Sequence, residues 1–442
     1  MTTATVFPDA VALRLPESFG SWRAELRDRG IPPVIAVAGS RGKSTVVHLL
    51  TAMLTGAGLR TATWTDEGVR VLGRRQRGEL LPWTRALAQL ATRELDVTVQ
   101  ELNWDTVHAV GLPRAAYPVV GVTNLCANSE ACLLRDETVR AVRALRTIRE
   151  AAYPEAVFVL NGDDWAVAGG DLEEEPNTIL VTVSRETPLV RSHLQRDRVA
   201  AWVEADILHF GREDEHQPFL SLSDVAITRE GLVGFQAINA LVAIGLARAI
   251  GLPMAPIAEA LRSFTAESER LPGSFNLLAV GGATVVVDRP AAPWFLRHPL
   301  RAVGHLPGER HVRVVGRLDG IANDELTETG RLLGRSGGLI IVHDDAGAPE
   351  RRDLLLHGIA ANDLPPVVVH TKSETAALTA LLKVLRPEDT VYVLADDPRY
   401  VLRRLQRATL QKGPRSSHPT VESTSESDPP NPAVAIRQDN SR

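Results

Sequence analysis

The segment Gly39–Thr45, with the sequence GSRGKST, constrains this chain more than any other feature. It follows the short apolar run Pro33–Ala38, whose β-branched residues are typical of a buried parallel strand. It precedes Val46–Leu54, where apolar residues repeat at helical spacing. A strand, a glycine turn and a helix N-terminus together direct backbone N–H groups toward one point. This geometry predicts a site for phosphate groups.

The side chains of this loop predict a nucleoside triphosphate as the ligand. Lys43 is expected to neutralise the terminal phosphates, and Ser44 to ligate Mg²⁺ through its hydroxyl group. Gly42 allows the backbone to approach the ligand closely. The loop is shorter than the common G-x4-G-K-[ST] form, because Val37 stands where that form has its first glycine. ATP and Mg²⁺ are the expected cofactors, and the expected cofactor-binding residues are Gly39, Ser40, Arg41, Gly42, Lys43, Ser44 and Thr45.

Lysine is rare in this chain. Of its 49 basic residues only four are lysine, namely Lys43, Lys372, Lys383 and Lys412. A codon bias toward arginine accounts for this, because the two residues serve almost equally on solvated surfaces. The lysine of the glycine loop therefore stands out, since none follows it for more than three hundred residues.

The composition excludes several classes of protein. A chain of 442 residues predicts two or three domains, and 44% hydrophobic with 23% charged residues is typical of a globular protein. A net charge of −5 predicts no nucleic-acid partner. We expect a cytoplasmic protein without a membrane segment, because apolar runs are short and the N-terminus lacks a signal-peptide pattern. Cys126 and Cys132 match no zinc or redox spacing, which favours a reducing compartment.

Alternating strand and helix patterns predict a doubly wound, mostly parallel α/β sheet in the first part of the chain. After the first strand, the expected strands are 96–102, 117–123, 156–160 and 178–183, with helices near 82–94 and 137–152. Short alternating stretches between residues 198 and 228 predict antiparallel strands on the same sheet. A helix-rich segment at 234–264 is expected to close this region.

A second, smaller Rossmann-like α/β domain is expected from about residue 276. Its expected strands are 283–288, 311–316, 339–343, 367–370 and 390–395, and its helices are 324–333, 351–359, 373–385 and 397–407. The predicted organisation is an N-terminal lead-in (1–30), an ATP-binding domain (31–270), the Rossmann-like domain (271–410) and a disordered tail (411–442).

The glycine loop and the helix after it resemble those of the Mur ligase superfamily, which includes the peptidoglycan amino-acid ligases, folylpolyglutamate synthetase and the C-terminal half of cyanophycin synthetase. Segments similar to other family motifs follow in the family's order: 119–124, 159–164, 239–244, 271–277 and 285–288. The resemblance covers roughly residues 30 to 410. Cyanophycin synthetase is the most similar subfamily, through three segments of its final domain: 323–326, 340–345 and 351–359. The alternative is the ligase subunit of poly-γ-glutamate synthesis, whose loop also reads G-x-R-G-K-S.

The resemblance implies an ATP-dependent acid–amino acid ligase. A substrate carboxylate would attack the γ-phosphate to give an acyl phosphate, and an amine would then displace phosphate. The implied partners are a small-molecule or peptide carboxylate and an amino-acid amine, and a homo-oligomer or a separate ATP-grasp partner stays open. By position, Glu101 would hold magnesium, Asn239 would face the adenine and Asp288 would bind the ribose or the phosphates. Lys43 and Glu101 are thus the expected catalytic residues, and Ser44 and Glu101 the expected metal ligands.

Several positions depart from the family pattern, mainly at its second metal. Asn124–Ser129 ends on serine where the family has a histidine. Arg146 stands near the family's carbamylated lysine, and a guanidinium cannot be carbamylated in its place. Asp288–Pro293 lacks the family's histidine and asparagine, and Ser274 replaces an arginine. Two functions therefore stay open: an active ligase, and an ATP-binding pseudoligase that serves as a scaffold or regulatory partner.

Other candidate residues carry weaker signals. His108, His193 and His209 have no partner at metal-ligand spacing. Two acidic pairs follow expected strands and are interpreted as solvated turn residues: Asp344–Asp345 and Asp396–Asp397. The basic segment Arg70–Arg77 is expected to be a solvated loop, with an acidic substrate as its alternative ligand.

Overall fold

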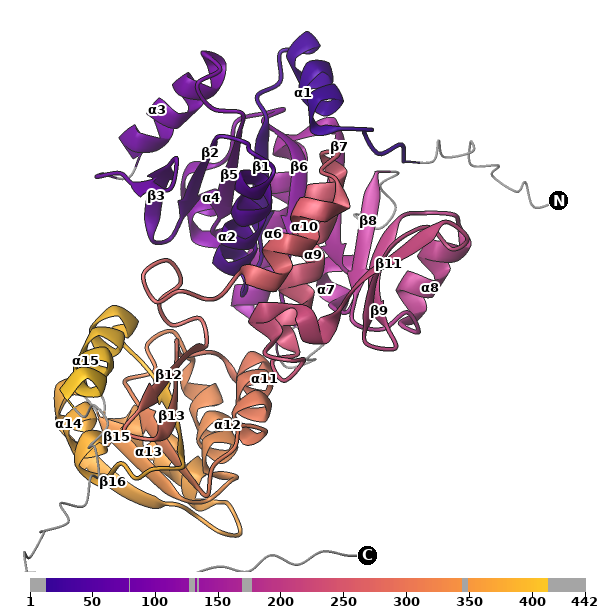
Figure 1. Ribbon diagram of the computed structural model, residues 1–442. Helices are drawn as coiled ribbons and strands as arrows, with labels where there is room; N and C mark the ends of the chain where they lie inside the picture. The colour runs from indigo at the N-terminus through magenta and orange to yellow at the C-terminus, as the bar shows by residue number, and fades with distance from the viewer. Residues whose placement is uncertain are drawn as a thin grey trace, which may run out of the picture.

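Two β-sheets divide the chain into an N-terminal and a C-terminal lobe (Figure 1). The computed structural model describes residues 13–78, 80–126, 132, 135–168, 177–343 and 349–411. The larger sheet has eleven strands and the smaller sheet has six. The predicted fold class, a P-loop α/β sheet followed by a second α/β unit, is confirmed. The domain boundaries drawn from the sequence stay a proposal, and residues 412–442 lie outside the described part of the chain.

The larger sheet is parallel in its centre and antiparallel at both edges. Its strand order is β11-β10-β9-β8-β7-β6-β1-β5-β2-β3-β4. The strands are β1 (Val34–Ala38), β2 (Thr61–Thr65), β3 (Gly68–Val71), β4 (Arg74–Arg75), β5 (Val97–Leu102), β6 (Tyr117–Val122), β7 (Ala152–Asn161), β8 (Thr178–Thr182), β9 (Ala200–Glu204), β10 (Ile207–Gly211) and β11 (His216–Ser221). The seven strands from β9 to β2 pair in parallel. The predicted antiparallel strands between residues 198 and 228 are present as β9 to β11.

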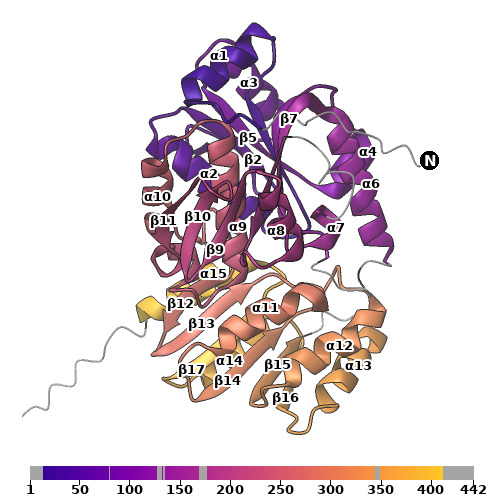
Figure 2. The same ribbon diagram turned by 90° about the vertical axis from the view of Figure 1, so that its right-hand side faces the viewer.

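Helices cover both faces of this sheet (Figure 2). They are α1 (Phe19–Asp28), α2 (Lys43–Gly56), α3 (Leu80–Ala91), α4 (Trp104–Val110), α6 (Asp136–Ala151), α7 (Trp165–Ala168), α8 (Pro188–Gln195), α9 (Phe235–Ala249) and α10 (Met254–Ser263). Helix α9 is buried along nearly its whole length, because it lies between α2 and strands β6 to β8. Its alanine-rich sequence suits this position, since small side chains allow close packing on several sides.

The basic segment Arg70–Arg77, expected to be a solvated loop, instead contains the edge hairpin β3–β4. Pairing with the rest of the sheet decides this, because β3 adds antiparallel to β2, a strand for which the sequence analysis gave no residue range. Exposed arginines on an edge strand also protect its free hydrogen-bonding groups from pairing with another chain.

Cys126 and Cys132 form a disulfide in the structure, which corrects the expectation of two reduced cysteines. Their sequence separation is six residues, so the bond closes only a local loop after β6. The length of the whole chain therefore does not argue against this disulfide. Pairing removes the support for a reducing compartment that rested on free thiols.

The smaller sheet has the strand order β12-β13-β17-β14-β15-β16. Its strands are β12 (Asn276–Val280), β13 (Ala283–Asp288), β14 (Arg310–Val315), β15 (Leu339–His343), β16 (Val367–Thr371) and β17 (Asp389–Leu394). Its helices are α11 (Pro293–Gly304), α12 (Asn323–Gly334), α13 (Pro349–Ala360), α14 (Glu374–Val384) and α15 (Pro398–Gln411). All pairs are parallel except the hairpin β12–β13. Strand β12 and helix α11 were not predicted. Helix α11 contains Pro299 in its interior, and proline there is a signal against a helix.

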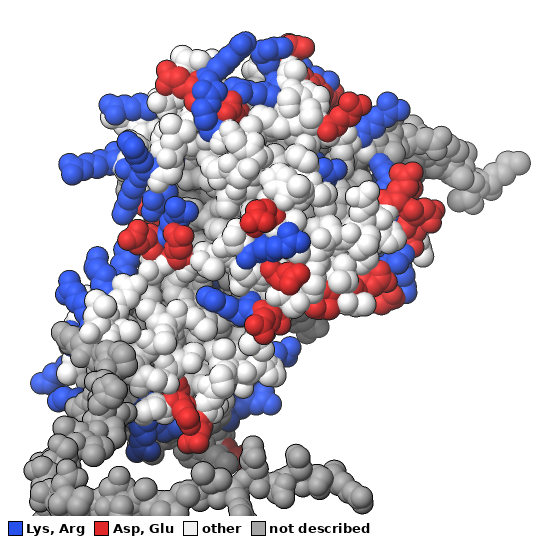
Figure 3. All heavy atoms as spheres, viewed as in Figure 1, with Lys and Arg blue, Asp and Glu red and all other residues white. Residues whose placement is uncertain are grey.

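The carboxyl ends of the parallel strands in both sheets face the space between the lobes. Residues at the carboxyl ends of β1, β2, β5 and β13, or directly after them, line one common cavity there. Ligands of open α/β sheets bind at the carboxyl ends of the strands, so this is where the fold positions a site. On the face drawn in Figure 3, basic and acidic side chains are intermixed. Within the described residues, no helix is both long and apolar enough to cross a bilayer.

Helix α1 is anchored to the larger sheet by Asp96, which leads to our first prediction. Arg60 donates to both carboxylate oxygens of Asp96, and Arg23 of α1 pairs with it as well. These hydrogen bonds lower the pKa of Asp96 to about 2. Because a lowered pKa favours the folded state above the unfolded pKa of about 4, Asp96→Asn should cost about 2 kcal/mol of stability at neutral pH.

Urea unfolding between pH 7 and pH 3 measures this effect. The difference between the wild type and Asp96→Asn should shrink as the pH falls below about 4 toward the folded pKa. Asp105→Asn is the matched control, because Asp105 is an exposed aspartate of α4 without a resolved ion pair. A difference that does not change with pH would contradict the electrostatic explanation.

Candidate functional site

A cavity of about 350 Å³ lies between the lobes at the carboxyl ends of both sheets. Its walls include most of the predicted site residues: Ser40, Arg41, Gly42, Lys43, Ser44, Thr45, Glu101, Asn239 and Asp288. Gly39, the first residue of the glycine loop, lies against Thr123 and Asn124 and is not among the residues that line the cavity. The structure therefore brings the predicted residues together, although they come from four distant segments of the chain.

Lys43, Ser44 and Glu101 form the polar floor of the cavity. Helix α2 begins at Lys43, and Glu101 lies in β5, which pairs directly with the strand before the loop. Ser44 Oγ donates to Glu101 Oε2 at 2.8 Å, and Lys43 Nζ lies 3.5 Å from Glu101 Oε1. Burial raises the pKa of the Glu101 carboxyl, and the positive charge of Lys43 opposes this rise. A buried carboxylate beside a hydroxyl group offers the oxygen ligands that Mg²⁺ prefers.

The glycine loop is held in place by the segment after β6. The backbone N–H of Ser40 donates to the carbonyl of Asn124 at 2.7 Å, and that of Arg41 donates to Asn124 Oδ1 at 3.0 Å. The Thr123 hydroxyl group donates to the Arg41 carbonyl at 2.6 Å. A Cβ on Gly39 would overlap Thr123 Oγ1, so glycine is required at this contact. The loop conformation is thus set before any ligand binds.

Asn239 lies against the glycine loop. Its Nδ2 donates to Gln236 Oε1 at 2.8 Å within α9, and its side chain is 4% exposed. A Cβ on Gly42 would overlap Asn239 Oδ1, and Gly42 has a positive φ of 86°. The side chain therefore packs under the loop as well as lining the cavity, and a contact with adenine stays a proposal.

Arg41 of the N-terminal lobe and Asp288 of the C-terminal lobe line the same cavity. Arg41 donates to the carbonyl of Pro290, and its guanidinium lies 5.7 Å from the ring centre of Phe295. Desolvation lowers the pKa of Arg41 and raises that of Asp288 to about 6. The Tyr392 hydroxyl group donates to Asp288 Oδ2 at 3.2 Å. Asp288 therefore has a structural partner on its own sheet and faces the cavity from the C-terminal lobe.

Glu67 makes a second link across the cavity, and the sequence analysis did not single it out. It follows β2 and pairs with Arg289 at 2.8 Å and with Arg399 of α15. Its neighbour Asp66 donates a backbone N–H to Glu101 Oε2 at 3.4 Å. The two acidic residues follow β2 directly, but the arginine partners of Glu67 are more than two hundred residues away in the sequence and gave no local signal. Phe235, Arg270 and Phe275 also line the cavity without having been predicted.

The region of the family's second metal differs from the pattern. Arg146 is exposed on α6, so its side chain is directed toward solvent. Asp164 is buried and accepts the backbone N–H groups of Leu125 and Cys126 at 2.7 and 2.8 Å. It thereby holds the backbone directly after β6, and residues 127–131, including Ser129, lie outside the described part of the chain. Asp164 belongs to the segment 159–164, which resembles a family motif, but its hydrogen bonds to the backbone after β6 were not predicted.

The weaker candidates lie apart from the cavity. His108 is exposed and contacts the carbonyl of Arg140 at 2.8 Å. His193 is buried against the carbonyl of Val199, and burial lowers its pKa to about 4. His209 stacks on Trp202 with ring centres 5.3 Å apart. Asp344–Asp345 lies outside the described residues, and Asp396 is considered below because it is not the solvated turn residue that we expected.

The fold and the cavity define the class to which this chain is similar, namely the P-loop ligases with a C-terminal Rossmann-like domain. E. coli FolC, solved with ADP, superimposes with a TM-score of 0.55 at 17% sequence identity, covering 92% of this chain and 96% of that one. This likeness establishes the fold. No protein-family model matches the sequence.

Two curated relatives agree with this fold. Cyanophycin synthetase from Synechocystis sp. (strain ATCC 27184 / PCC 6803 / Kazusa) is 24% identical over 374 residues, which are 82% of this chain and 42% of that protein. UDP-N-acetylmuramoylalanine–D-glutamate ligase from Streptomyces coelicolor is 28% identical over 384 residues, which are 84% of this chain and 72% of that protein. The chain thus spans less than half the length of the cyanophycin synthetases that it matches. The predicted resemblance to the Mur ligase superfamily and to cyanophycin synthetase is confirmed.

Proposed function

We propose that this chain is an ATP-dependent acid–amino acid ligase that works through an acyl phosphate. The observation that carries the proposal is the contact of Lys43 and Ser44 with the buried Glu101, under a glycine loop and opposite a second α/β lobe. The ligase names of the relatives and the ADP in E. coli FolC support it.

The residues of the cavity suit each requirement of that reaction. Lys43 and the N–H groups at the start of α2 would neutralise the phosphates of ATP. Ser44 and Glu101 would hold Mg²⁺, which supplies charge neutralisation at the transferred phosphate. When ATP binds, Lys43 would exchange its contact with Glu101 for phosphate oxygens, leaving the carboxylate to the metal ion. Arg41 and Glu67 would keep the C-terminal lobe over the cavity and exclude water from the acyl phosphate.

Acceptor-dependent phosphate release tests the proposal. The full chain is incubated with ATP and Mg²⁺ and with a panel of amino acids and peptides as acceptors. Hydroxylamine is added in parallel, because it converts an acyl phosphate into a stable hydroxamate. We expect phosphate release only with an acceptor, and Glu101→Gln should reduce the rate by about 100-fold, as loss of a charge-stabilising group typically does. Measurable ATP binding without turnover for any acceptor would count against a ligase.

The exposed position of Arg146 favours one alternative, an ATP-binding pseudoligase. Without a carbamylated lysine in α6, the second metal would lack one ligand found in many family members. A crystal structure with a non-hydrolysable ATP analogue and Mg²⁺ separates the two functions. Two metal ions held by substitute residues would exclude the pseudoligase, whereas a single ion at Ser44 and Glu101 without turnover would favour it.

A further inference from the structure

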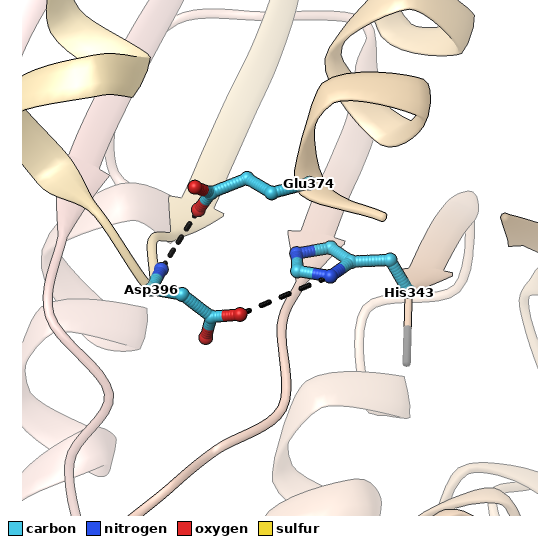
Figure 4. A group of neighbouring side chains, drawn as sticks. All are labelled: His343, Glu374 and Asp396. Carbon is cyan, nitrogen blue, oxygen red and sulfur yellow. Dashed lines mark hydrogen bonds and ion pairs between the residues drawn. The ribbon is translucent and has the colours of Figure 1, made fainter. Parts of the chain in front are cut away.

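Three side chains of types that can ligate metals converge at the carboxyl edge of the smaller sheet (Figure 4), and none of them is among the residues that line the cavity. His343 ends β15, Asp396 follows β17, and Glu374 is the first residue of α14. One donor atom from each residue lies within 4.8 Å of the other two. Because β17 pairs with β13, the group is at the same sheet edge as Asp288.

Contacts with neighbouring groups place the three side chains beside one another. The imidazole of His343 is 1% exposed, and its Nδ1 lies 3.9 Å from Asp396 Oδ2. The backbone N–H of Asp396 donates to Glu374 Oε1 at 2.8 Å, which fixes the two carboxylates relative to each other. The loop after β14 closes on the same aspartate, since a Cβ on Gly316 would overlap Asp396 Oδ1. Side chains that three separate chain segments bring together in this way are typical of a built site.

The charges around this group favour a bound cation. The two carboxylates lie beside a third acidic residue, Asp397, whose backbone N–H donates to Glu374 Oε1 at 3.4 Å. The basic group that faces them is Arg317, whose Nε lies 3.3 Å from Asp396 Oδ2. Its side chain is 47% exposed, so it can move into solvent at little cost. A divalent cation would balance both carboxylates more completely than this partly exposed guanidinium.

We propose that His343, Glu374 and Asp396 bind a divalent transition-metal ion of the Zn²⁺ type. One imidazole nitrogen and two carboxylate oxygens form a donor set that zinc accepts, whereas magnesium takes oxygen ligands only. Tetrahedral ligands at about 2.0 Å from zinc lie about 3.3 Å apart, so the donors, which lie within 4.8 Å of one another, need to approach by at most about 1.5 Å. Rotation of the glutamate and aspartate side chains supplies that movement. Water would complete the coordination.

The bound ion would tie together the ends of β15 and β17 and the start of α14. These are the segments beside Arg317 and the Gly316–Gly320 turn, at the edge that faces the N-terminal lobe. This inference is independent of the proposed ligase reaction, because neither Lys43 nor Glu101 takes part in it.

Metal titration of the full chain tests the inference. The protein is first dialysed against a chelator, and Zn²⁺ binding is then measured by calorimetry and Co²⁺ binding by its visible absorption spectrum. We expect one tightly bound Zn²⁺ per chain. The visible absorption spectrum of bound Co²⁺ should be typical of a site with a low coordination number. His343→Gln and Glu374→Gln should each weaken Zn²⁺ binding by at least about 100-fold, since losing an outer-shell partner alone costs roughly 10- to 100-fold.

Matched controls separate this site from other binding. His357→Gln removes an exposed histidine of α13 in the same lobe and should leave Zn²⁺ affinity unchanged. Glu101→Gln should also leave it unchanged, even if the ligase proposal fails. Glu374→Gln and Asp396→Asn preserve the shapes of the side chains, so both variants are expected to fold. Circular dichroism of each variant checks this. No stoichiometric Zn²⁺ in the wild type, or equal binding in folded His343→Gln and Asp396→Asn variants, would overturn the inference and leave a metal-free ion-pair cluster.

Discussion

Lys43→Ala is expected to abolish acceptor-dependent phosphate release and to weaken ATP binding by about 100-fold or more. Each hydrogen bond to a charged group contributes about 1.5–3 kcal/mol, and a lysine at the terminal phosphates would make at least one or two. Isothermal titration with ATP and Mg²⁺ measures the affinity. Lys383→Ala is the matched control, because Lys383 lies on α14 in the other lobe. Retained ATP affinity in the variant would mean that the glycine loop is not the phosphate site.

The same substitution should also reveal the buried contact with Glu101. Without ATP, Lys43 is the cation beside a carboxylate whose side chain is 2% exposed. Removing one member of a buried ion pair costs about 3–5 kcal/mol, and proton uptake by the other member limits that cost. Because the remaining carboxyl has a raised folded-state pKa, the loss should be small below pH 4 and should grow as the pH rises toward that raised value.

A double variant separates the loss of binding from the loss of stability. Lys43→Ala/Glu101→Gln replaces the unpaired carboxylate with a neutral amide, which still accepts the Ser44 hydrogen bond. Its urea midpoint at pH 7 should lie closer to that of the wild type than the midpoint of Lys43→Ala does. ATP binding should stay weak, since the cation is still missing. If Lys43→Ala alone has wild-type stability at every pH, the contact with Glu101 contributes nothing to folding.

Gly42→Ala should have the second of the two largest effects. Gly42 has φ of 86°, and a left-handed conformation costs an L-residue about 1–2 kcal/mol. The new methyl group would also overlap Asn239 Oδ1, and the side chain of Asn239 is held by Gln236. We expect ATP binding to weaken by at least about 30-fold, because the loop must shift by more than a hydrogen bond tolerates. Isothermal titration measures the loss of ATP affinity, and thermal unfolding measures the loss of stability.

Gly56→Ala is the control for this substitution. Gly56 ends the same helix, and a Cβ there has no heavy atom within 4 Å. Alanine should therefore be neutral or slightly stabilising. Gly42→Ala/Asn239→Ala removes the overlap but keeps the backbone strain, so it should recover only part of the ATP affinity. Full affinity in Gly42→Ala would show that the loop reaches its ligand in another conformation.

The phosphate loop could be predicted because its signal is local. A buried strand, a glycine turn and an apolar helix follow one another in about twenty residues, and each is recognised from its own spacing. Most other parallel strands could be placed for the same reason, since apolar β-branched runs alternate with helical patterns. The role of Glu101 could not be predicted from local spacing alone, because it came from the order of motifs in the family that the chain resembles. The structure then brought it to Ser44 through the pairing of β1 with β5.

Features that depend on distant pairing could not be predicted. Glu67 gains its meaning only from Arg289 and Arg399, which are more than two hundred and more than three hundred residues away. The hairpin β3–β4 exists because it extends β2, and its arginine-rich sequence resembles a solvated loop. Asp396 was interpreted as a solvated turn residue, because the acidic pair alone does not reveal the buried histidine opposite it.

The sequence by itself therefore determined the α/β class, the glycine loop and the lysine that stands in it. These follow from local periodicity and from the backbone needs of a tight turn, which act over a few residues. The tertiary structure decided which carboxylates face which cations: Glu101 beside Lys43, Glu67 between two arginines, and His343 with Glu374 and Asp396. Side chains from distant segments meet only when parallel strands align their carboxyl ends at one edge, and that alignment depends on packing of the whole sheet.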